Sequence, residues 1–178
     1  RTEEIIRPIL RGRDIKRYGY DWAGQWLIAT FPSRGYDIEQ YPAVKNYLLS
    51  FGIERLEQTG KEHTINGQKI KARKKTHNKW FETQDSIGYW EDFLKPKIVW
   101  GEISDIPKFG FDAKGEMYCE ATSFLMVGND LPFIYLFLNS TICLYQFCKI
   151  GTTTGVGTLR WKKYKIQELL IPTRACSR

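Results

Sequence analysis

The order of the short apolar segments is the feature that most limits how this chain can fold. Stretches rich in strand-forming residues occur at residues 24–31, 97–103 and 122–128, and apolar residues at helical spacing follow Pro42 and Pro132. These segments are interspersed, but they lack the regular βαβ alternation that builds a parallel sheet. The sequence therefore predicts an α+β fold, with residues 1–178 forming a single domain of mixed, mostly antiparallel strands with interspersed helices.

Turn and cap residues refine this expectation. Gly52 is expected to kink or end the helix that Pro42 opens, and the pair Asn66-Gly67 predicts a short hairpin within a loop. A second hairpin is predicted around residues 112–115. Asp130 is expected to be the N-cap of a buried helix that runs to Leu138, followed by a second helix over residues 140–149. Residues 159–172 are predicted to be a basic amphipathic helix with a strand-like exit.

The cysteine spacing, the length of the apolar runs and the first residue give further expectations about the class of protein. Cys119, Cys143, Cys148 and Cys176 show no C-x-x-C spacing and have only two histidines for company, so we expect reduced thiols of a cytosolic protein and no metal site. No apolar run reaches the roughly 18 residues that span a bilayer, so no membrane contact is expected. The first residue is Arg1 and not Met, which leads us to expect a piece of a larger protein.

Basic residues gather in three clusters, at residues 7–17, 69–79 and 160–165, and each cluster is interleaved with aromatic residues. The net charge is +7, and the stretch "KIKARKKTHNKWF" (residues 69–81) contains no acid. Clusters that converge on one face would bind a polyanion strongly and with marked salt sensitivity, because each cation displaces a counterion from a phosphate. For contacts to the DNA backbone, the sequence proposes Arg11, Arg13, Lys16, Arg17, Lys74, Lys75, Arg160, Lys162 and Lys163. For base recognition it proposes Arg73, His77, Asn78 and Lys79, with Thr152, Thr153 and Thr154 on the opposite side.

Other interpretations of the same residues stay open. Each basic cluster could simply be a solvated surface, and Trp80 and Trp100 are better explained as core anchors than as stacking platforms. Two Asp-x-Lys tripeptides, at residues 14–16 and 112–114, could belong to a small metal-dependent nuclease, although so short a pattern often occurs by chance. A basic module that binds protein or RNA is the third possibility. No catalytic residue is proposed.

The order of several segments resembles the TaqI-like C-terminal specificity domain, the target recognition domain of type IIG restriction–modification enzymes and related adenine-N6 DNA methyltransferases. The similarity covers essentially the whole chain, and its most distinctive parts are "LRGRDIKRY" (residues 10–18) and "KPKIVWGEIS" (residues 95–104). The residues upstream of "KWFE" (residues 79–82) fall where such domains vary, so base contacts do not transfer to them.

This resemblance implies a non-catalytic module that recognises a short sequence in double-stranded DNA, taken from the C-terminal part of a bacterial or archaeal cytoplasmic enzyme. It would position the DNA for methyltransferase domains of the parent chain and, where the parent also cleaves, for endonuclease domains. The resemblance implies no cofactor in this domain, whereas the parent would use S-adenosylmethionine and Mg.

Overall fold

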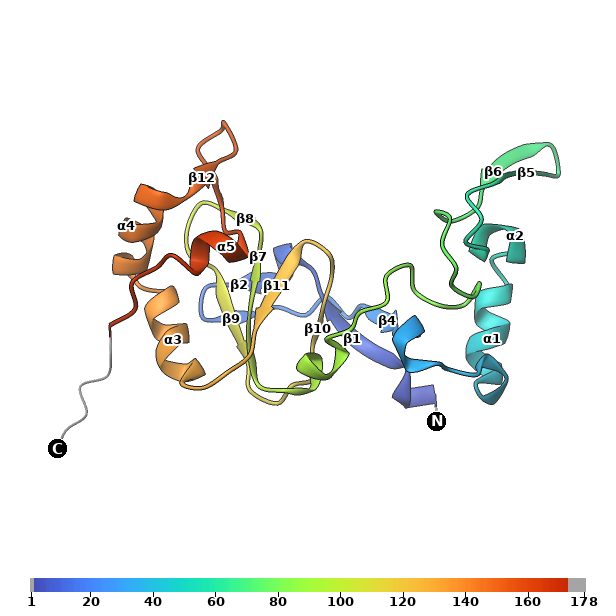
Figure 1. Ribbon diagram of the computed structural model, residues 1–178, viewed down its shortest axis with the longest axis horizontal. Coiled ribbons are helices and arrows are strands. Elements are labelled where there is room, and N and C mark those ends of the chain that lie inside the picture. Colours follow the sequence, from blue (N-terminus) through green and yellow to red (C-terminus); the bar gives the residue numbers. More distant parts are fainter. Residues whose placement is uncertain (1, 173–178) are drawn as a thin grey trace. The chain divides into compact units, whose positions relative to one another are not determined.

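The computed structural model describes residues 2–172 of the chain, which divide into two compact units (Figure 1). Unit 1 comprises the described residues up to Arg7 together with Trp26–Trp90, and unit 2 comprises Pro8–Gln25 and the described residues from Glu91 on. The described part holds five α-helices and several small sheets whose strands are mostly antiparallel, so the α+β class is confirmed. The assignment of residues 1–178 to a single recognition domain stays a prediction.

Unit 1 is built around two short helices and a hairpin. Its core contains five buried side chains: Ile5 near the start of the chain, Ile38 and Tyr41 from the segment just before the first helix, Val44 from that helix, and Phe81. Trp80 is half-buried against this core, in keeping with a role as an anchor. Its elements are β4 (Trp26–Ile28), α1 (Pro42–Leu49), α2 (Ile53–Leu56), β5 (Glu62–Ile65) and β6 (Gln68–Lys71).

Two predicted turn residues of unit 1 act as expected. Pro42 opens α1, where its missing N–H removes no helical hydrogen bond. Gly52 lies between α1 and α2 with a φ of 87°, a left-handed conformation that glycine adopts without a steric penalty. The hairpin at Asn66-Gly67 is also confirmed, because β5 and β6 pair in antiparallel fashion around these two residues, which have φ of 49° and 78°.

Unit 2 is organised around a three-stranded antiparallel sheet in which β7 lies between β11 and β9. The chain segment that opens unit 2 forms the hairpin β2–β3, which packs across β9, and Leu10 and Ile15 from this segment are buried with Val99 of β7. The strands of unit 2 are β2 (Ile15–Lys16), β3 (Gly19–Tyr20), β7 (Lys97–Gly101), β8 (Ile103–Ser104), β9 (Phe109–Asp112), β10 (Tyr118–Cys119), β11 (Ser123–Met126), β12 (Thr152–Thr153) and β13 (Leu159–Arg160). Strand β1 (Ile6–Leu10) begins in unit 1, and its last two residues pair in parallel with β10.

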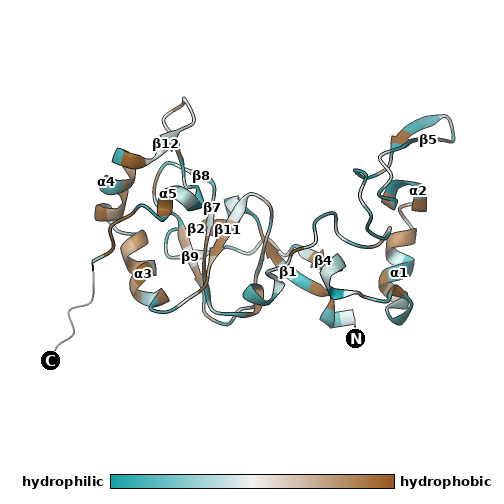
Figure 2. Ribbon diagram, in the orientation of Figure 1, coloured by the Kyte–Doolittle hydropathy of each residue, from teal (hydrophilic) through white to brown (hydrophobic). Residues whose placement is uncertain are grey.

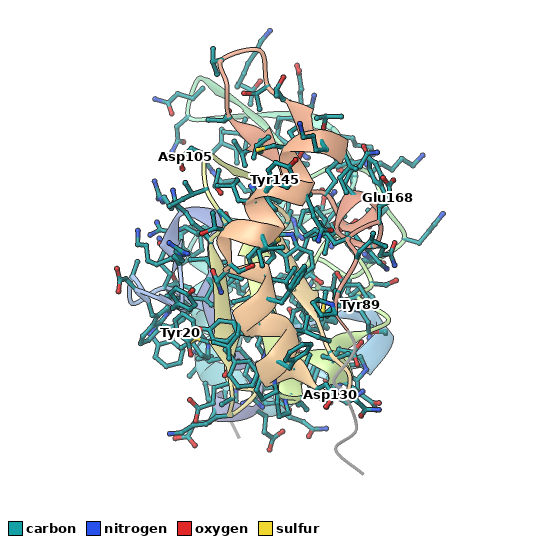
Figure 3. All side chains as sticks on the ribbon, turned by 90° about the vertical axis from the view of Figure 1, so that its left-hand side faces the viewer. Tyr20, Tyr89, Asp105, Asp130, Tyr145 and Glu168 are labelled. Atoms are coloured by element: carbon teal, nitrogen blue, oxygen red, sulfur yellow. The ribbon has the colours of Figure 1, made fainter. Side chains whose placement is uncertain are left out.

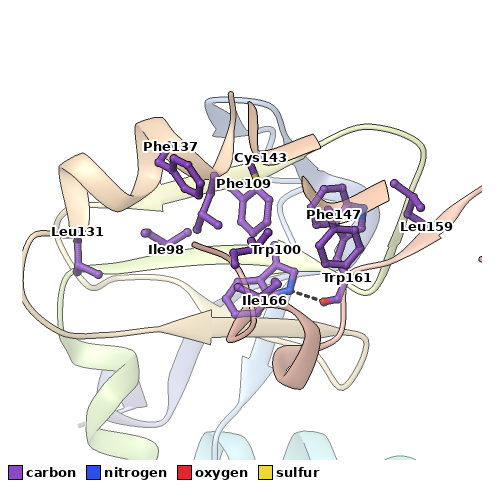
Figure 4. Close-up of a cluster of buried hydrophobic side chains, with 12 residues drawn as sticks. Ile98, Trp100, Phe109, Leu131, Phe137, Cys143, Phe147, Leu159, Trp161 and Ile166 are labelled. Atoms are coloured by element: carbon purple, nitrogen blue, oxygen red, sulfur yellow. Dashed lines mark hydrogen bonds between the residues drawn. The ribbon is translucent and has the colours of Figure 1, made fainter. Parts of the chain in front are cut away.

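Aromatic side chains dominate the main core of unit 2 (Figure 4). Trp100 is 2% exposed, and its indole N–H donates to the carbonyl oxygen of Trp161 over 2.7 Å. The ring of Trp161 stacks on Phe147 with a centroid distance of 3.9 Å. Trp100 is therefore a core residue, as the sequence predicts. Fixing Trp161 in this way also fixes the backbone on either side of it, at Arg160 and Lys162.

Helices α3 (Leu131–Leu138), α4 (Thr141–Ile150) and α5 (Lys163–Ile166) complete unit 2, and Figure 3 looks onto α3 and α4 from outside. The predicted pair of helices is confirmed, and Asp130 lies at the N-cap position of α3. The helices are not fully buried, because each packs one face on the core while Leu136 of α3 and Tyr145 of α4 are exposed. Within the described residues, no single helix is long and apolar enough to cross a bilayer; α3 and α4 meet that criterion only when taken together, and they are bent by 70°.

Two predictions for unit 2 are wrong. β9 and β10 do not form a hairpin, because β9 pairs with β7 while β10 pairs with β1. The chain leaves the sheet after Asp112, whose carboxylate accepts the N–H groups of Gly115 and Met117 and so fixes a turn. The C-terminal segment is not one helix either: residues 159–160 form β13, and only Lys163–Ile166 is helical. Leu159 and Trp161 need strand-like alternation to reach the core.

The described cysteines Cys119, Cys143 and Cys148 are all free thiols, in agreement with the prediction. Burial raises the pKa of the Cys143 thiol to about 12, so this side chain behaves as a small apolar core residue. Cys176 lies outside the described residues.

Candidate nucleic-acid interface

The first and third basic clusters meet within unit 2 where two glycines touch. A Cβ on Gly101 would lie 3.0 Å from the Cα of Gly12, so the loop that carries Arg11 and Arg13 lies directly on the end of β7. Glu102 follows Gly101, and its backbone oxygen accepts the N–H of Trp161 over 2.7 Å. Two segments far apart in the sequence therefore reach one place, which we call the basic corner: Arg11–Arg13, Glu102, Thr152, Arg160 and Lys162.

Glu102 is the acidic centre of the basic corner. Its Oε1 atom lies 3.0 Å from a guanidinium nitrogen of Arg160 and 3.6 Å from the ammonium of Lys162. Thr152 pairs with Arg160 across β12 and β13, and directly opposed residues of an antiparallel pair point to the same face. Leu159 points into the core, so the neighbouring row with Thr152 and Arg160 faces solvent. Two cations share one carboxylate here, which leaves positive charge for an anionic partner.

Two further predicted backbone contacts, Arg11 and Arg17, also have structural partners. Arg11 forms a bidentate ion pair with the buried Asp14, at 2.7 Å for the shortest contact, and this hydrogen bond holds the pKa of Asp14 below its usual value. Arg17 donates from two nitrogens to the carbonyl oxygen of Asn139 and thereby ties the β2–β3 turn to the end of α3. Contact of these two residues with DNA remains a prediction, and each residue also has a structural role that accounts for its charge.

The other predicted residues of unit 2 are accessible. Arg13, Lys16 and Lys163 are exposed, and the ammonium of Lys16 donates to the carbonyl oxygen of Arg13 over 3.1 Å. Thr152 and Thr153 are exposed on β12, and Thr154 begins the loop between β12 and β13 with a hydrogen bond from its N–H to Thr158. Residues 154–158 thus form the tip of the hairpin that β12 and β13 make.

The second basic cluster lies in unit 1, where we call residues 73–79 the basic loop. A buried glutamine that the sequence analysis did not single out fixes its shape. The amide of Gln58 donates to the carbonyl oxygens of Lys79 and Glu82, and its oxygen accepts the hydroxyl of Thr76 over 2.8 Å. The backbone of Gln58 also accepts the N–H of Thr76. The Gln58 side chain therefore holds the basic loop at its middle and at its C-terminal end.

Two predicted base-reading residues, Asn78 and Arg73, form hydrogen bonds to backbone carbonyl oxygens of unit 1. The amide nitrogen of Asn78 donates to the carbonyl oxygens of Thr83 and Gln84, at 3.1 and 2.9 Å, so both of its N–H groups are engaged. A bidentate contact to adenine needs one of those N–H groups. Arg73 is half-buried and donates to the carbonyl oxygen of Trp80, and burial lowers its pKa. Base reading by the amide N–H groups of Asn78 would require their contacts to open.

The remaining residues of the basic loop are available to a partner. Lys74, Lys75 and His77 are exposed, and the exposed Lys79 carries its ammonium 5.6 Å from the ring centre of Phe81. The hairpin β5–β6, which immediately precedes the loop, adds Lys69 and Lys71 to this exposed positive surface. Unit 1 therefore presents a denser and less neutralised cluster than the basic corner.

Both Asp-x-Lys tripeptides have structural roles. Asp112 is buried against the ammonium of Lys97, with 2.6 Å between the charged atoms, and it also accepts two backbone N–H groups of its turn. Asp14 is buried against Arg11. Within residues 2–172, no three acidic, histidine or cysteine side chains are grouped so that they could hold a metal ion.

The comparison with protein families decides the class. The family model of the TaqI-like C-terminal specificity domain matches residues 7–171 of the 178. The chain belongs to this family. Specificity domains are recognition modules, and this one is accordingly associated with DNA target recognition in restriction–modification enzymes. A comparison with curated proteins found no match.

Within this specificity domain, the two residues that organise the basic segments are not among those predicted from the sequence. Gln58 carries no charge and stands in a polar stretch, so its composition gives no sign that it is buried. Glu102 precedes an apolar residue in a strand-like segment, and only the pairing of β8 with β13 brings it to Arg160. Neither contact could be read from spacing along the chain.

Proposed function

We propose that this specificity domain recognises a short sequence in double-stranded DNA and positions it for a methyltransferase domain of the same parent chain, and for an endonuclease domain where the parent has one. The observation that carries this proposal is the family match, which extends over nearly the whole chain. The basic corner and the basic loop supply surfaces of the right charge for the phosphate backbone, which dominates affinity for DNA.

The catalytic steps are assigned to the parent's other domains. Both Asp-x-Lys aspartates of this chain are buried in ion pairs, so neither is presented to a substrate. This supports recognition, and not nucleic-acid cleavage, as the role of the domain. S-adenosylmethionine and Mg would be bound by the parent's catalytic domains.

The salt dependence of binding tests this function. Affinity for a DNA duplex should fall linearly with salt on logarithmic axes, and each lost phosphate contact should reduce the slope by about 0.9. We expect Arg160→Gln and Lys162→Gln each to reduce the slope by this amount. Lys95→Gln is the matched control, because Lys95 is also an exposed lysine paired with an acid, but it lies just before the opposite end of β7.

The measurement is fluorescence anisotropy of a labelled 24-base-pair duplex across a salt series, with double-stranded RNA as a competitor. Sequence-dependent preference for DNA over RNA is the expected result. A flat salt response, or RNA that competes as well as DNA, would contradict the proposed function and favour a protein- or RNA-binding role.

A further inference from the structure

The hairpin of unit 1, residues Glu62–Lys71, stands out from its surroundings, and we call it the ribbon. In Figure 1 it extends beyond α2 as a two-stranded arm, and most of it is coloured hydrophilic in Figure 2. Among the described residues, none of the buried core side chains comes from the ribbon, and the helix that contacts β6 is α2. A two-stranded arm of this kind needs a reason other than core formation, because an isolated hairpin has little stability of its own.

The two faces of the ribbon differ in chemistry. The register places Glu62 opposite Lys71 and Thr64 opposite Lys69, so these four side chains share one face. All four are exposed. On the other face His63, Ile65 and Ile70 are half-buried. One face is therefore turned toward unit 1 and the other is presented to solvent as a polar surface.

The exposed face carries the side chains that read base edges. Lysine recognises the O6 and N7 atoms of guanine, glutamate accepts from the N4 amino group of cytosine, and threonine contacts several bases. No acid follows Glu62 until Glu82, so lysines dominate the surface that the ribbon and the basic loop form together. That charge fits the phosphates that flank a groove.

The dimensions of the ribbon match the major groove of B-form DNA. Two paired strands lie about 4.8 Å apart, and four residues of strand extend roughly 13 Å. The major groove is about 12 Å wide and 8.5 Å deep, and it admits a two-stranded ribbon. The turn at Asn66-Gly67 keeps the tip narrow, because two residues with positive φ reverse the chain in the least space.

From these observations we infer that the ribbon enters the major groove and that Thr64, Lys69 and Lys71 determine part of the DNA sequence that the domain selects. This inference rests on the proposed function and goes beyond it by naming the reading element. It also reassigns recognition from Asn78, whose amide N–H groups are engaged, and from the half-buried Arg73, which donates to Trp80, to side chains that point outward. The basic loop then serves the flanking phosphates.

The test compares variants on the two faces of the same ribbon. Lys69→Gln, Lys71→Gln and Thr64→Val change the exposed face. Lys61→Gln, immediately before the ribbon, removes the same charge from the side of the opposite face, because the N–H of Ala72 donates to the carbonyl oxygen of Lys61 and side chains alternate along the strand. Gln68→Ala is an uncharged control, also on that opposite face. All five positions are exposed, so each variant should fold.

The preferred sequence is measured by selection of bound duplexes from a randomised library. We expect the exposed-face variants to lose preference at one or two positions of the selected sequence by roughly 5- to 150-fold, the discrimination of one good base contact. Lys61→Gln and Gln68→Ala should keep the full preference. Methylation of guanine N7, which lies in the major groove, should block binding of the unmodified protein at one position of the selected sequence. Binding of Lys69→Gln should be insensitive to methylation at that position.

Three results are distinguishable. If the exposed-face variants alone relax the selected sequence, the ribbon is the reading element. If every variant selects the same sequence as the unmodified protein, the ribbon proposal is overturned while the proposed function stands. If the unmodified protein selects no sequence, the proposed function itself fails, and the ribbon proposal fails with it.

Discussion

At the scale of single residues, Lys97 shows how burial can reverse the expected role of a charged side chain. Its ammonium is fully enclosed in unit 2, where it donates to the carbonyl oxygen of Phe93 and to the carboxylate of Asp112. Nothing in "KPKIVWGEIS" distinguishes it from the exposed Lys95 two residues earlier. Lys95 precedes β7 and pairs with Asp92 at the surface, whereas Lys97 begins the strand, where the neighbouring β9 supplies the acid that permits burial.

Replacing Lys97 tests this role. Lys97→Met should lower the free energy of unfolding by about 3–5 kcal/mol, because it leaves the carboxylate of Asp112 buried without its counterion. Lys95→Met, which disrupts the exposed pair with Asp92, should cost at most about 1 kcal/mol. Urea unfolding followed by tryptophan fluorescence measures both values. Equal losses in the free energy of unfolding for the two variants would contradict the role assigned to burial of the Lys97–Asp112 pair.

At the scale of elements, contacts between neighbours in the sequence are predictable, and pairings at long range are not. The Asn66-Gly67 hairpin follows from local backbone preferences, since two residues with positive φ suffice to define it. The error over β9 and β10 has the opposite origin, because β10 leaves its sequence neighbour for β1, about 110 residues earlier in the chain. The same holds for the basic corner, where the two glycines that meet are 89 positions apart.

The glycine contact can be tested directly. Gly101→Ala should destabilise unit 2 by about 1–3 kcal/mol, because its Cβ would lie 3.0 Å from the Cα of Gly12 and backbone atoms cannot move aside cheaply. Gly19→Ala is the control, since a Cβ there meets no heavy atom within 4 Å and the φ of Gly19 is not in the left-handed region. Thermal unfolding compares them. An unchanged melting temperature for Gly101→Ala would contradict the close contact.

At the scale of the whole molecule, stability against acid depends on carboxylates that serve the fold. Burial alone would raise the pKa of Asp112, but hydrogen bonds from Lys97 and from the N–H of Met117 outweigh it and lower the pKa. The pKa of Asp14 is also lowered, chiefly by its hydrogen bond to Arg11. Both groups therefore release protons more readily in the folded protein than in the unfolded chain.

The sign of the pH dependence follows from these shifts. The two groups contribute stability that is fully present above the unfolded pKa of about 3.9, and this stability is lost as the pH falls through their lower folded values. We expect Asp14→Asn and Asp112→Asn to be less stable at neutral pH and to lose less further stability below pH ~4. Urea midpoints measured between pH 7 and pH 3 test this; parallel curves for all three proteins would contradict it.

The sequence predicts the α+β class, the basic clusters and the family, because these follow from composition, local pattern and segment order. It does not predict which cations remain available for a partner. Arg11, Arg73 and Asn78 look like ideal ligands for DNA, but each has a partner within the fold that composition does not announce. Lys69 and Lys71 lie on the exposed face of the ribbon because of the register between β5 and β6, which the sequence alone does not specify.

The independence of the ribbon from the buried cores bears on how such a protein can change. Substitutions at Thr64, Lys69 or Lys71 alter side chains that the described hydrophobic clusters do not include. Variation on that exposed face is thus decoupled from folding, and a lineage could acquire a new cognate site through a few point changes while retaining the same scaffold. The arm is consequently the natural segment to graft between homologues when engineering a different target preference.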